Sequence, residues 1–464
     1  MSGWVPQIED RRGPRYLAIA DAIGEAIRDG SLQPEERLPT HRDLAYDLGV
    51  TVGTVSRAYA EAVRRDYVIG EVGRGTYVKP ENEPDNPFHI PYDVEPDIYD
   101  FSLNFPAEEG RVELLSKALM GVAQDPGLGA LMRYQSEQGM EHHRQAMAKW
   151  AAHHGAPNDP ERIVVSNGVQ HAMTLSLMAL SKAGDTLLCE EYSYPGIKTL
   201  ATQLGLKMQG LPMDGEGIIP EKLEEAIVQT GARMLYCMPN FQNPTNVVMG
   251  LDRRKEIALI AKKYGVWIIE DDIYGFLHDD PSAHTPFASL LPEQTFYLNG
   301  ASKCVSPGVR VGFVLAPKQK VSTVAACMRL SSWMAAPLNV ELTARWIEDG
   351  TVFDLMEWHR GEAQSRQAVM NKALQGQDFL SLQGTYHAWL RLPAPWSAEM
   401  FCLRARERDV SILPAHVFHI GKKQPENAVR ICYGSPPNLD HVEEGMSRLA
   451  TLLSEEIHAF HNVM

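Results

Sequence analysis

Cysteine is scarce in this chain, and positive charge is not in surplus. The 464 residues include six cysteines, none of them in a C-x-x-C pair, which argues against a disulfide-stapled or zinc-binding protein and favours a reduced, cytoplasmic one. The formal net charge is -15 at pH 7. This charge argues against a surface that binds nucleic acid over its whole extent, but it does not exclude one small DNA-binding module.

No signal peptide opens the sequence, and no apolar run approaches the roughly 20 residues that a membrane-spanning helix needs. We therefore expect neither secretion nor contact with a membrane. The composition itself is ordinary for a soluble globular protein, since 44% of the residues are hydrophobic and 22% are charged. The length predicts two or three domains.

Two short helices and a hairpin are predicted in the first eighty residues. A helix capped by Thr40 stops near Gly49, and a second helix, capped by Thr51, starts at once. Residues 67–69 and 76–78 then have the character of two strands around a glycine-containing turn. A helix-turn-helix followed by such a wing places its second helix in the major groove of DNA. A plain helical cap on a larger domain is the alternative.

This part of the chain resembles the winged-helix domain of the GntR family of transcription regulators. The matching residues are Arg37-Leu38-Pro39, Arg42, Leu44-Ala45, Leu48-Gly49-Val50, Thr54-Val55, Ala58-Tyr59 and Gly73-Arg74-Gly75-Thr76. The resemblance implies that Arg42 contacts the DNA backbone, that the helix beginning near Val52 reads bases, and that the wing at Gly75 touches the minor groove. The DNA-binding residues expected on this basis are Arg37, Arg42, Thr51, Thr54, Arg57, Arg74 and Gly75.

Two residues depart from the GntR pattern, in which an arginine is usual at the position of Val52 and a glycine at that of Asp66. Residues 1–80 hold 11 Lys/Arg and 12 Asp/Glu, so no broad basic face is expected. Affinity for double-stranded operator DNA must then rest on a few arginines. This predicts a modest salt dependence and a dimer that binds two half-sites.

Residues 81 to 100 contain no lysine or arginine, but they contain seven Asp/Glu and four prolines. A segment of this composition does not pack on its own and is expected to be extended. It predicts a winged-helix domain at 1–80, a linker at 81–100 and a second domain at 101–464. The linker either transmits movement between the two domains or is a passive tether.

Beyond the linker, apolar strands alternate with amphipathic helices, which predicts an α/β fold with a mostly parallel sheet covered on both faces. The expected strands are 163–165, 186–189, 234–237, 266–269, 296–298 and 311–314. Lys303 follows one of them. A lysine desolvated at the mouth of such a sheet gains the nucleophilic amine that a Schiff base with pyridoxal phosphate requires. Taken alone, Ser302-Lys303 also fits an ordinary surface loop.

Other strand ends carry residues suited to the same chemistry. Gly168 opens a helix whose backbone amides can bind an anion, and Arg310 offers a fork for a phosphate. Tyr194 can stack on a flat ring, Asn243 can donate to a phenolate oxygen, and Asp271 can hold a pyridinium nitrogen protonated. Each signal is weak by itself, but their order along the chain is hard to obtain by chance.

In this order the motifs resemble those of the fold-type I, class I aminotransferases over roughly residues 100 to 455. The resemblance implies pyridoxal 5'-phosphate as the cofactor and Lys303 as the catalytic residue that carries it. The implied cofactor contacts are Tyr134, Gly168, Val169, Gln170, Tyr194, Asn243, Asp271, Tyr274, Ser302, Lys303 and Arg310. By the same resemblance, Tyr134 reaches the phosphate of the neighbouring subunit, and Arg430 grips the α-carboxylate of an amino compound.

The sequence also departs from the aminotransferase pattern. Gly300 stands where a phosphate-binding serine is usual and Val169 where a small hydroxyl residue is common, so phosphate binding should survive but be weaker. The glycine common near the start of the enzymes is replaced within residues 102–106, which puts ordinary substrate handling in doubt. The histidine pairs 142–143 and 153–154 lack metal-ligand companions at useful spacing, so they are interpreted as solvated helix residues and no metal site is expected.

A GntR winged helix joined to an aminotransferase-like domain is the architecture of the MocR (GabR-like) regulators, which this sequence resembles throughout. The resemblance implies a head-to-tail homodimer that senses a small amino compound. By the same resemblance, the compound's amine is expected to displace Lys303 in an external aldimine, and the altered dimer is expected to control catabolic or transport genes. Net turnover is not expected, but the sequence leaves open an active aminotransferase that carries a DNA-binding domain. A non-catalytic gauge of pyridoxal phosphate is a further rival, against which the carboxylate clamp Arg430 argues.

Overall fold

The computed structural model describes residues 4–6, 14–28, 30–33, 36–64, 67–71, 75–78, 98–107, 111–280, 284–421 and 423–455. The chain divides into two compact units, Met1–Ile90 and Pro91–Met464, and each is described by itself. The predicted DNA contact Arg74 and most of the predicted linker, residues 81–97, lie outside the described residues. The domain limits at residues 80 and 100 therefore stay a prediction.

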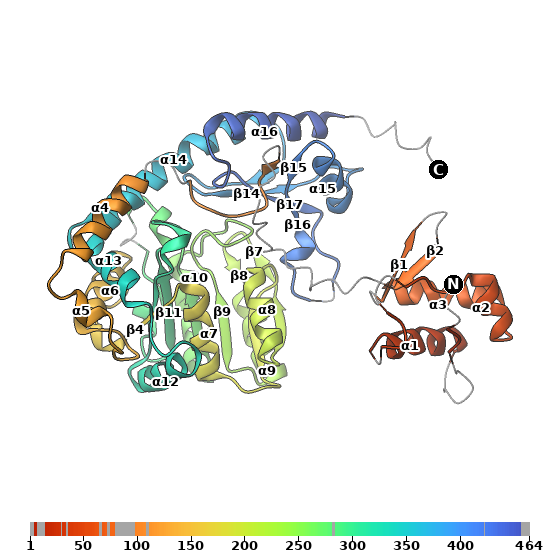
Figure 1. Ribbon diagram of the computed structural model, residues 1–464, viewed down its shortest axis with the longest axis horizontal. Coiled ribbons are helices and arrows are strands. Elements are labelled where there is room, and N and C mark those ends of the chain that lie inside the picture. Colours follow the sequence, from red (N-terminus) through yellow and green to blue (C-terminus); the bar gives the residue numbers. More distant parts are fainter. Residues whose placement is uncertain are drawn as a thin grey trace. The chain divides into compact units, whose positions relative to one another are not determined.

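The first unit is a helix-turn-helix followed by a two-stranded wing, as the sequence predicted (Figure 1). Its elements are α1 (Arg15–Arg28), α2 (His41–Asp47), α3 (Val52–Arg64), β1 (Val68–Glu71) and β2 (Gly75–Val78). The backbone N–H of Asp43 donates to Oγ1 of Thr40, and that of Thr54 donates to Oγ1 of Thr51. Both predicted threonine caps are thereby confirmed.

A small apolar core holds these elements together. Ile19 of α1, Leu44 of α2 and Val55 of α3 are fully buried in one cluster. The antiparallel strands β1 and β2 close the cluster with Val68 opposite Val78, and both valines are buried. Because each helix turns its apolar stripe toward this core, the polar faces of α2 and α3 are left at the surface.

The second unit is built on a seven-stranded sheet with the strand order β4-β12-β11-β10-β9-β5-β6. These strands are β4 (Ile163–Ser166), β5 (Thr186–Glu190), β6 (Lys207–Leu211), β9 (Met234–Cys237), β10 (Trp267–Asp271), β11 (Thr295–Gly300) and β12 (Gly312–Leu315). Strand β12 is antiparallel to both of its neighbours, and the other pairs are parallel. The mostly parallel sheet and the six predicted strands are confirmed. Strands β4, β9, β11 and β12 are buried along their whole length, as in a sheet covered on both faces.

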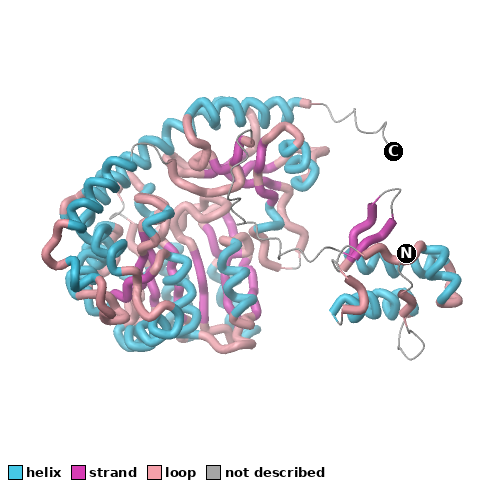
Figure 2. The backbone as a smooth tube through the Cα atoms, in the orientation of Figure 1, coloured by secondary structure: helices cyan, strands magenta, loops and turns pink. Residues whose placement is uncertain are grey.

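Helices surround the sheets of the second unit, which Figure 2 shows as cyan tubes beside magenta strands. They are α4 (Arg111–Ala123), α5 (Leu128–Leu131), α6 (Glu141–His153), α7 (Val169–Leu180), α8 (Pro195–Gln203), α9 (Pro220–Thr230), α10 (Leu251–Tyr264), α11 (Phe287–Leu290), α12 (Val321–Ser331), α13 (Pro337–Glu348), α14 (Thr351–Ala373), α15 (Ala398–Arg406) and α16 (Leu439–Ser454). Within the described ranges, no helix combines the length and the apolar character that crossing a membrane requires.

A second, antiparallel sheet with the order β13-β14-β17-β16 completes the unit. Its strands are β13 (Phe379–Leu380), β14 (His387–Arg391), β16 (Leu413–Pro414) and β17 (Ala428–Cys432), and a short hairpin is formed by β7 (Met213–Asp214) and β8 (Gly217–Ile218). Helices α14, α15 and α16 pack with this smaller sheet in a separate apolar core.

Strand β3 (Tyr99–Asp100) pairs in parallel with β15 (Val410–Ser411). The last two residues of the range predicted as linker therefore form part of the second unit. Phe101 follows directly and is fully buried in the core beneath the smaller sheet. The pairing fixes the start of the segment 102–107, which then runs past the carboxyl ends of the large sheet's strands.

Candidate functional site

Lys303 lies just after β11, where the chain leaves the sheet. Its amine donates a hydrogen bond to the backbone oxygen of Asn104 and lies 5.6 Å from the ring centroid of Phe105. Burial lowers the pKa of Lys303 from an ordinary value of 10.5 to about 8, because desolvation disfavours the charged form. Near neutral pH this amine is therefore a better nucleophile than that of a surface lysine.

Asp271 is the last residue of β10 and is buried. Its Oδ2 accepts a hydrogen bond from the hydroxyl of Tyr236 at 2.9 Å, and its Oδ1 accepts one from the backbone N–H of Ile273 at 3.2 Å. Burial raises the pKa of Asp271 to about 6, although both hydrogen bonds favour the ionised form. A buried carboxylate fixed by two donors is suited to hold a proton on a ring nitrogen.

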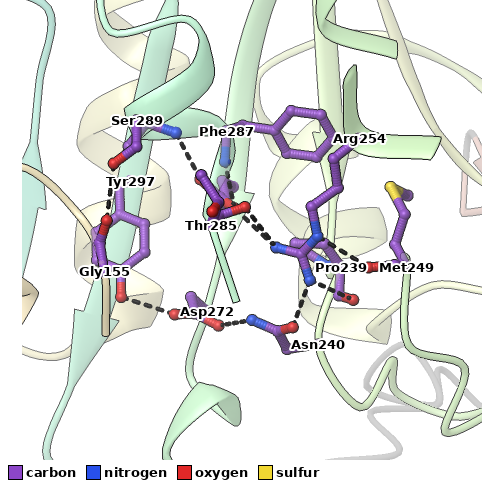
Figure 3. A network of polar contacts seen from close by, with 12 residues as sticks. Gly155, Pro239, Asn240, Met249, Arg254, Asp272, Thr285, Phe287, Ser289 and Tyr297 are labelled. Carbon is purple, nitrogen blue, oxygen red and sulfur yellow. Dashed lines mark hydrogen bonds and ion pairs between the residues drawn. The ribbon is translucent and has the colours of Figure 1, made fainter. Parts of the chain in front are cut away.

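The adjacent carboxylate, Asp272, binds a separate set of partners (Figure 3). It accepts hydrogen bonds from Nδ2 of Asn240 at 2.6 Å and from the hydroxyl of Tyr297 at 2.7 Å. Oδ1 of Asn240 accepts in turn from Nη2 of Arg254, whose Nε donates to the backbone oxygen of Met249. This buried network anchors the end of β10, so Asp272 is structural while Asp271 remains for the site.

Arg430, in β17, is 2% exposed. Its Nη1 donates to Oδ1 of Asn243 at 2.9 Å, its Nη2 donates to the backbone oxygen of Ser102, and its guanidinium carbon lies 4.6 Å from the ring centroid of Phe418. Its Nε has no hydrogen-bond partner, and none of the described carboxylates pairs with it. A buried guanidinium without a counter-ion destabilises the folded state. The carboxylate of a ligand would pair with it through two parallel hydrogen bonds.

Two residues near Lys303 were not predicted from the sequence. Nδ2 of Asn104 donates to the hydroxyl of Tyr274 at 2.8 Å and lies 3.1 Å from Nδ1 of His387. Burial lowers the pKa of His387 to about 3, so the imidazole is neutral. Asn104 lies in the segment 102–106, where the glycine common in the family is replaced. That departure could have drawn attention to Asn104. For His387 the sequence held no such signal, since a lone histidine in a strand looks alike in a core and in a site.

The predicted anion site lies where α7 begins, directly after Gly168, with the amides of Val169 and Gln170 in its first turn. Gly168 has a φ of 88°, and a Cβ there would lie 2.8 Å from Nη2 of Arg310, so only glycine permits this approach. That same Nη2 donates to the backbone oxygen of Asn167 at 3.3 Å. The helix N-terminus and the guanidinium thus meet at one place.

The structure explains the glycine at position 300. A Cβ on Gly300 would lie 2.7 Å from the backbone oxygen of Val311 and 3.0 Å from Cγ2 of Val169. A side chain has no room there, and the methyl group of Val169 fills the neighbouring space. The family pattern would supply one hydroxyl group at position 300 and one at position 169. Both are absent here, and the two replacements pack against each other. The weaker phosphate binding expected from their absence stays a prediction.

Tyr194 and Tyr134 have very different surroundings. Burial raises the pKa of Tyr194 to about 12, and the charges of Asp271, Arg430 and Arg310 also act on its hydroxyl. The stacking of Tyr194 on the cofactor ring stays a prediction. Ser302, beside Lys303, is half-buried. Tyr134 is 81% exposed, and its ring contacts that of Trp333 at 5.4 Å between centroids. It lies at the surface of its own chain, where a second copy could be reached.

Together these residues fit a cofactor that carries an aldehyde, a ring nitrogen and a phosphate. The enclosed amine of Lys303, the carboxylate of Asp271 and the anion site at α7 offer one partner for each group. Oε1 of Gln170, Oδ1 of Asn104 and Nε of Arg430 are buried without a hydrogen-bond partner. A bound ligand would supply these three atoms with hydrogen-bond partners.

On the winged helix, the predicted DNA contacts that the structure describes are exposed, apart from the half-buried Thr54 and Gly75. Arg42 lies in the first turn of α2, and Thr51 caps α3. The side chain of Arg37 lies close to Gly75 in the wing. A Cβ on Gly75 would lie only 2.7 Å from Nε of Arg37. The guanidinium carbon of Arg57 lies 4.4 Å from the ring centroid of Tyr16, so Arg57 also packs against α1. Whether these residues touch DNA stays a prediction.

The interpretation of the histidine pairs as solvated was wrong for one member of each pair. His143 and His154 are 1% and 2% exposed. Neighbours on a helix point about 100° apart, so one histidine of each pair turns from the solvent into the core. The expected lack of a companion was also wrong for the first pair, because both His142 and His143 contact the carboxylate of Glu341. That glutamate lies on α13, far away in the sequence.

Comparison with known families agrees with this architecture. Residues 97–446 match the family described as aminotransferase class I and II, and residues 15–78 match the bacterial regulatory proteins of the gntR family. The chain belongs to the class I and II aminotransferase family. This aminotransferase-family protein carries a GntR-type helix-turn-helix domain ahead of the family domain, as the sequence predicted.

Individual relatives fall into two groups. The uncharacterized HTH-type transcriptional regulator YdeF of Bacillus subtilis is 28% identical over 452 residues, 97% of each chain. The mitochondrial kynurenine/alpha-aminoadipate aminotransferase of Mus musculus is 27% identical over 318 residues, 64% of this chain and 74% of the mouse protein. The structure of LysN, the alpha-aminoadipate aminotransferase of Thermus thermophilus complexed with N-(5'-phosphopyridoxyl)-L-leucine, aligns with a TM-score of 0.70 and 25% identity, covering 77% of this chain and 92% of that chain. The relative named as a regulator spans both units of this aminotransferase-family protein.

Proposed function

We propose that the protein is a DNA-binding transcription regulator that depends on pyridoxal 5'-phosphate, senses a small amino compound and controls genes for catabolism or transport. The observation that carries the proposal is the presence, in one chain, of a GntR-type domain and of an aminotransferase-family pocket whose carboxylate clamp, Arg430, is buried without a counter-ion. A pocket built for an amine and a carboxylate, attached to a DNA-binding domain, has the parts of a sensor.

In the pocket each residue has its own task. Bound pyridoxal phosphate supplies an aldehyde that bonds to amines and a ring that takes up negative charge. Lys303 offers the amine to which the cofactor is attached, since its lowered pKa leaves a large neutral fraction near pH 8. Asp271 holds the proton on the ring nitrogen. The first turn of α7 and Arg310 bind the phosphate.

The effector in this proposal carries both an amine and a carboxylate. Arg430 would bind the carboxylate through its Nη2 and Nε edge, and its bond to the backbone oxygen of Ser102 would then be released, while Lys303 would be the group that the effector's amine replaces. That bond ties Arg430 to the segment 102–107, which begins at strand β3 and also holds Lys303 and Tyr274 through Asn104. Ligand binding therefore changes contacts of the segment that leads back toward the DNA-binding unit.

The proposal includes a head-to-tail homodimer in which Tyr134 of each chain reaches the phosphate of the other. Two observations support it. Tyr134 is exposed on its own chain, and α4 presents exposed apolar side chains, with Val112, Leu119 and Met120 at 82%, 51% and 56% exposure. A run of exposed apolar residues marks an interaction surface. A dimer also brings two winged helices to two half-sites.

The decisive experiment measures coupling between ligand and DNA. Amines are screened by the absorbance of the bound cofactor, and an operator is selected from random duplexes with the protein itself. A ligand that acts as an effector should change operator affinity by about 5-fold to 150-fold, the typical range of coupling. By thermodynamic reciprocity, the operator should change the ligand's affinity by the same factor.

The rival function, an active aminotransferase with an attached DNA-binding domain, gives a different result. It converts the amino compound to the matching keto acid over many turnovers while operator affinity stays constant. If a ligand occupies the pocket fully and the affinity, footprint and bend of the DNA all remain unchanged, the sensor proposal is wrong. A ligand can shift an equilibrium only through a difference in its affinity for the two states.

A further inference from the structure

Two histidines and one glutamate meet between α6 and α13, apart from the residues assigned to the cofactor. His142 and His143 place their Nε2 atoms 2.7 Å and 3.0 Å from the same oxygen, Oε2 of Glu341. All three atoms lie within 4.8 Å of one another, and in the described part of the chain no other trio of His, Cys, Asp or Glu does so. The atoms come from two different helices and converge on one point.

We propose that this cluster binds one zinc ion through Nε2 of His142, Nε2 of His143 and Oε2 of Glu341, with a water as the fourth ligand. Zinc takes histidine nitrogen and carboxylate oxygen at about 2.0 to 2.2 Å in tetrahedral geometry, and a two-histidine, one-glutamate set with an open position is an established zinc site. The side chain of His142 is 50% exposed, against 1% for His143 and 11% for Glu341. The ion and its water therefore reach the cluster from the His142 side.

The surroundings of Glu341 are those of a metal-binding carboxylate. Its second oxygen, Oε1, accepts a hydrogen bond from Nε of Arg345 at 2.7 Å, and Nη2 of Arg345 donates to Oδ2 of Asp125. Outer partners of this kind fix the orientation of a ligating side chain. Without an ion, two imidazoles must share one carboxylate oxygen at the edge of the core. A divalent cation would instead give each of the three ligand atoms its own bond.

The site has a structural role in this proposal. The ion joins α6 to α13, and through Arg345 and Asp125 it also holds the chain that follows α4. Tyr134 lies in the stretch between that chain and α6. A zinc ion would therefore brace the segment to which the proposed function assigns contact with the second subunit. The site does not depend on that function, because its ligands are all in one chain.

Binding of Zn²⁺ to the untagged, full-length protein tests the proposal. The protein is freed of metal with a chelator, and equilibrium dialysis with elemental analysis then counts the bound ions. We expect one equivalent per chain and a Tm that rises with the free Zn²⁺ concentration, because an ion that binds only the folded state stabilises it. Co²⁺, substituted for Zn²⁺, should give visible absorbance bands that report a low-symmetry site.

Variants of the ligands and of matched histidines locate the ion. His142→Ala removes one ligand, and Glu341→Gln replaces a carboxylate ligand by a neutral, weaker amide oxygen. Each should weaken binding by more than the roughly 10-fold to 100-fold that loss of an outer partner costs. Two controls should bind as the wild type does. His153→Ala alters the exposed member of the other histidine pair on α6, and His416→Ala alters a surface histidine that contacts Glu399 at 3.1 Å.

The proposal is overturned if the wild-type protein takes up less than one equivalent of Zn²⁺ at micromolar free ion, which would mean a hydrogen-bonded cluster only. It is also overturned if His142→Ala retains the wild-type affinity and Co²⁺ spectrum. His142 is half-exposed, so its replacement should leave the fold intact, and this variant decides the question even if Glu341→Gln fails to fold. Thermal unfolding without metal is recorded for each variant to separate loss of the site from loss of the structure.

Discussion

The two units of this protein hold their functional residues in opposite ways. In the aminotransferase-family unit, Asp271 and Arg430 are buried and the amine of Lys303 is enclosed. Burial sets their chemistry, lowering the pKa of Lys303 to about 8 and raising that of Asp271 to about 6. In the winged helix, Arg42 and Thr51 are exposed over an apolar core. Burial is therefore not expected to change their chemistry before a partner binds.

The fold of one chain thus places Asp271 and Arg430 in buried positions and encloses the amine of Lys303, whereas the residues predicted to bind DNA lie at the surface. A substitution in the pocket should abolish cofactor attachment or strongly weaken ligand binding, because water cannot take over the hydrogen bonds of a buried group there. A change on the winged helix should alter an affinity by a limited amount, because several exposed contacts share it. The following predictions test this difference, beginning with the largest expected effect.

Lys303→Ala should abolish covalent attachment of pyridoxal phosphate while leaving the protein folded. The buried amine of Lys303 lies where the charges of both Asp271 and Arg310 act on it. Borohydride reduction followed by mass spectrometry measures the attachment. Lys318→Ala, which alters a lysine whose side chain is 71% exposed, is the control and should keep it. A reducible adduct that persists in Lys303→Ala would show that another lysine carries the cofactor.

Arg430→Lys should weaken binding of a carboxylated amine by about 2 kcal/mol or more, roughly 30-fold, the scale of truncating one partner of a buried hydrogen-bonded charge pair. Lysine keeps the charge but loses the planar fork that binds both carboxylate oxygens. The measurement is a titration followed by cofactor absorbance. The decarboxylated analogue of the same amine is the matched ligand and should bind the variant and the wild type alike. Equal losses for both ligands would contradict the clamp.

The site residues that the sequence predicts best are those that directly follow a strand. Lys303, Asp271 and Asn243 each follow a readable apolar run, and parallel strands bring their carboxyl ends to one edge. Asn104 reaches the site only because β3 pairs with β15, and nothing local marks that pairing. Glu341 meets His142 across 199 residues for a similar reason. Such contacts come from long-range packing, which spacing within a motif does not record.

Arg42→Ala should weaken DNA binding by about 1 to 3 kcal/mol, the range of a hydrogen bond to a charged group. Because phosphate contacts position a protein without reading sequence, the loss should be the same for the operator and for an unrelated duplex. Titrations at several salt concentrations measure both the loss and the salt slope, which should fall by about one ion. A loss confined to the operator would instead make Arg42 a base-reading residue.

The pH dependence of cofactor uptake should separate the enclosed lysine from an ordinary one. With a pKa of about 8, the neutral fraction of Lys303 rises roughly fivefold from pH 7 to pH 8 but less than about twofold from pH 8 to pH 9. The rate at which the cofactor-free protein takes up pyridoxal phosphate should therefore level off above pH 8. A model peptide lysine with a pKa near 10.4 should still gain about tenfold over the second interval. Stopped-flow absorbance measures both rates.

The smallest expected effect is at the cap of α2. Thr40 Oγ1 accepts from the backbone N–H of Asp43 at 3.3 Å, and its hydroxyl donates to Oδ2 of Asp43 at 2.7 Å. Thr40→Ala removes both bonds and should cost about 1 kcal/mol, the usual value of an N-cap. That cost makes local opening about fivefold more frequent, so hydrogen exchange in the peptide that covers α2 should quicken by that factor. Exchange in β10 and β11 and the absorbance of the bound cofactor should not change, because the cap bonds lie wholly within the winged helix. If Thr40→Ala also loosens the strands that hold Asp271 and Lys303, the pocket is not assembled by its own unit alone, and the contrast between the two units fails.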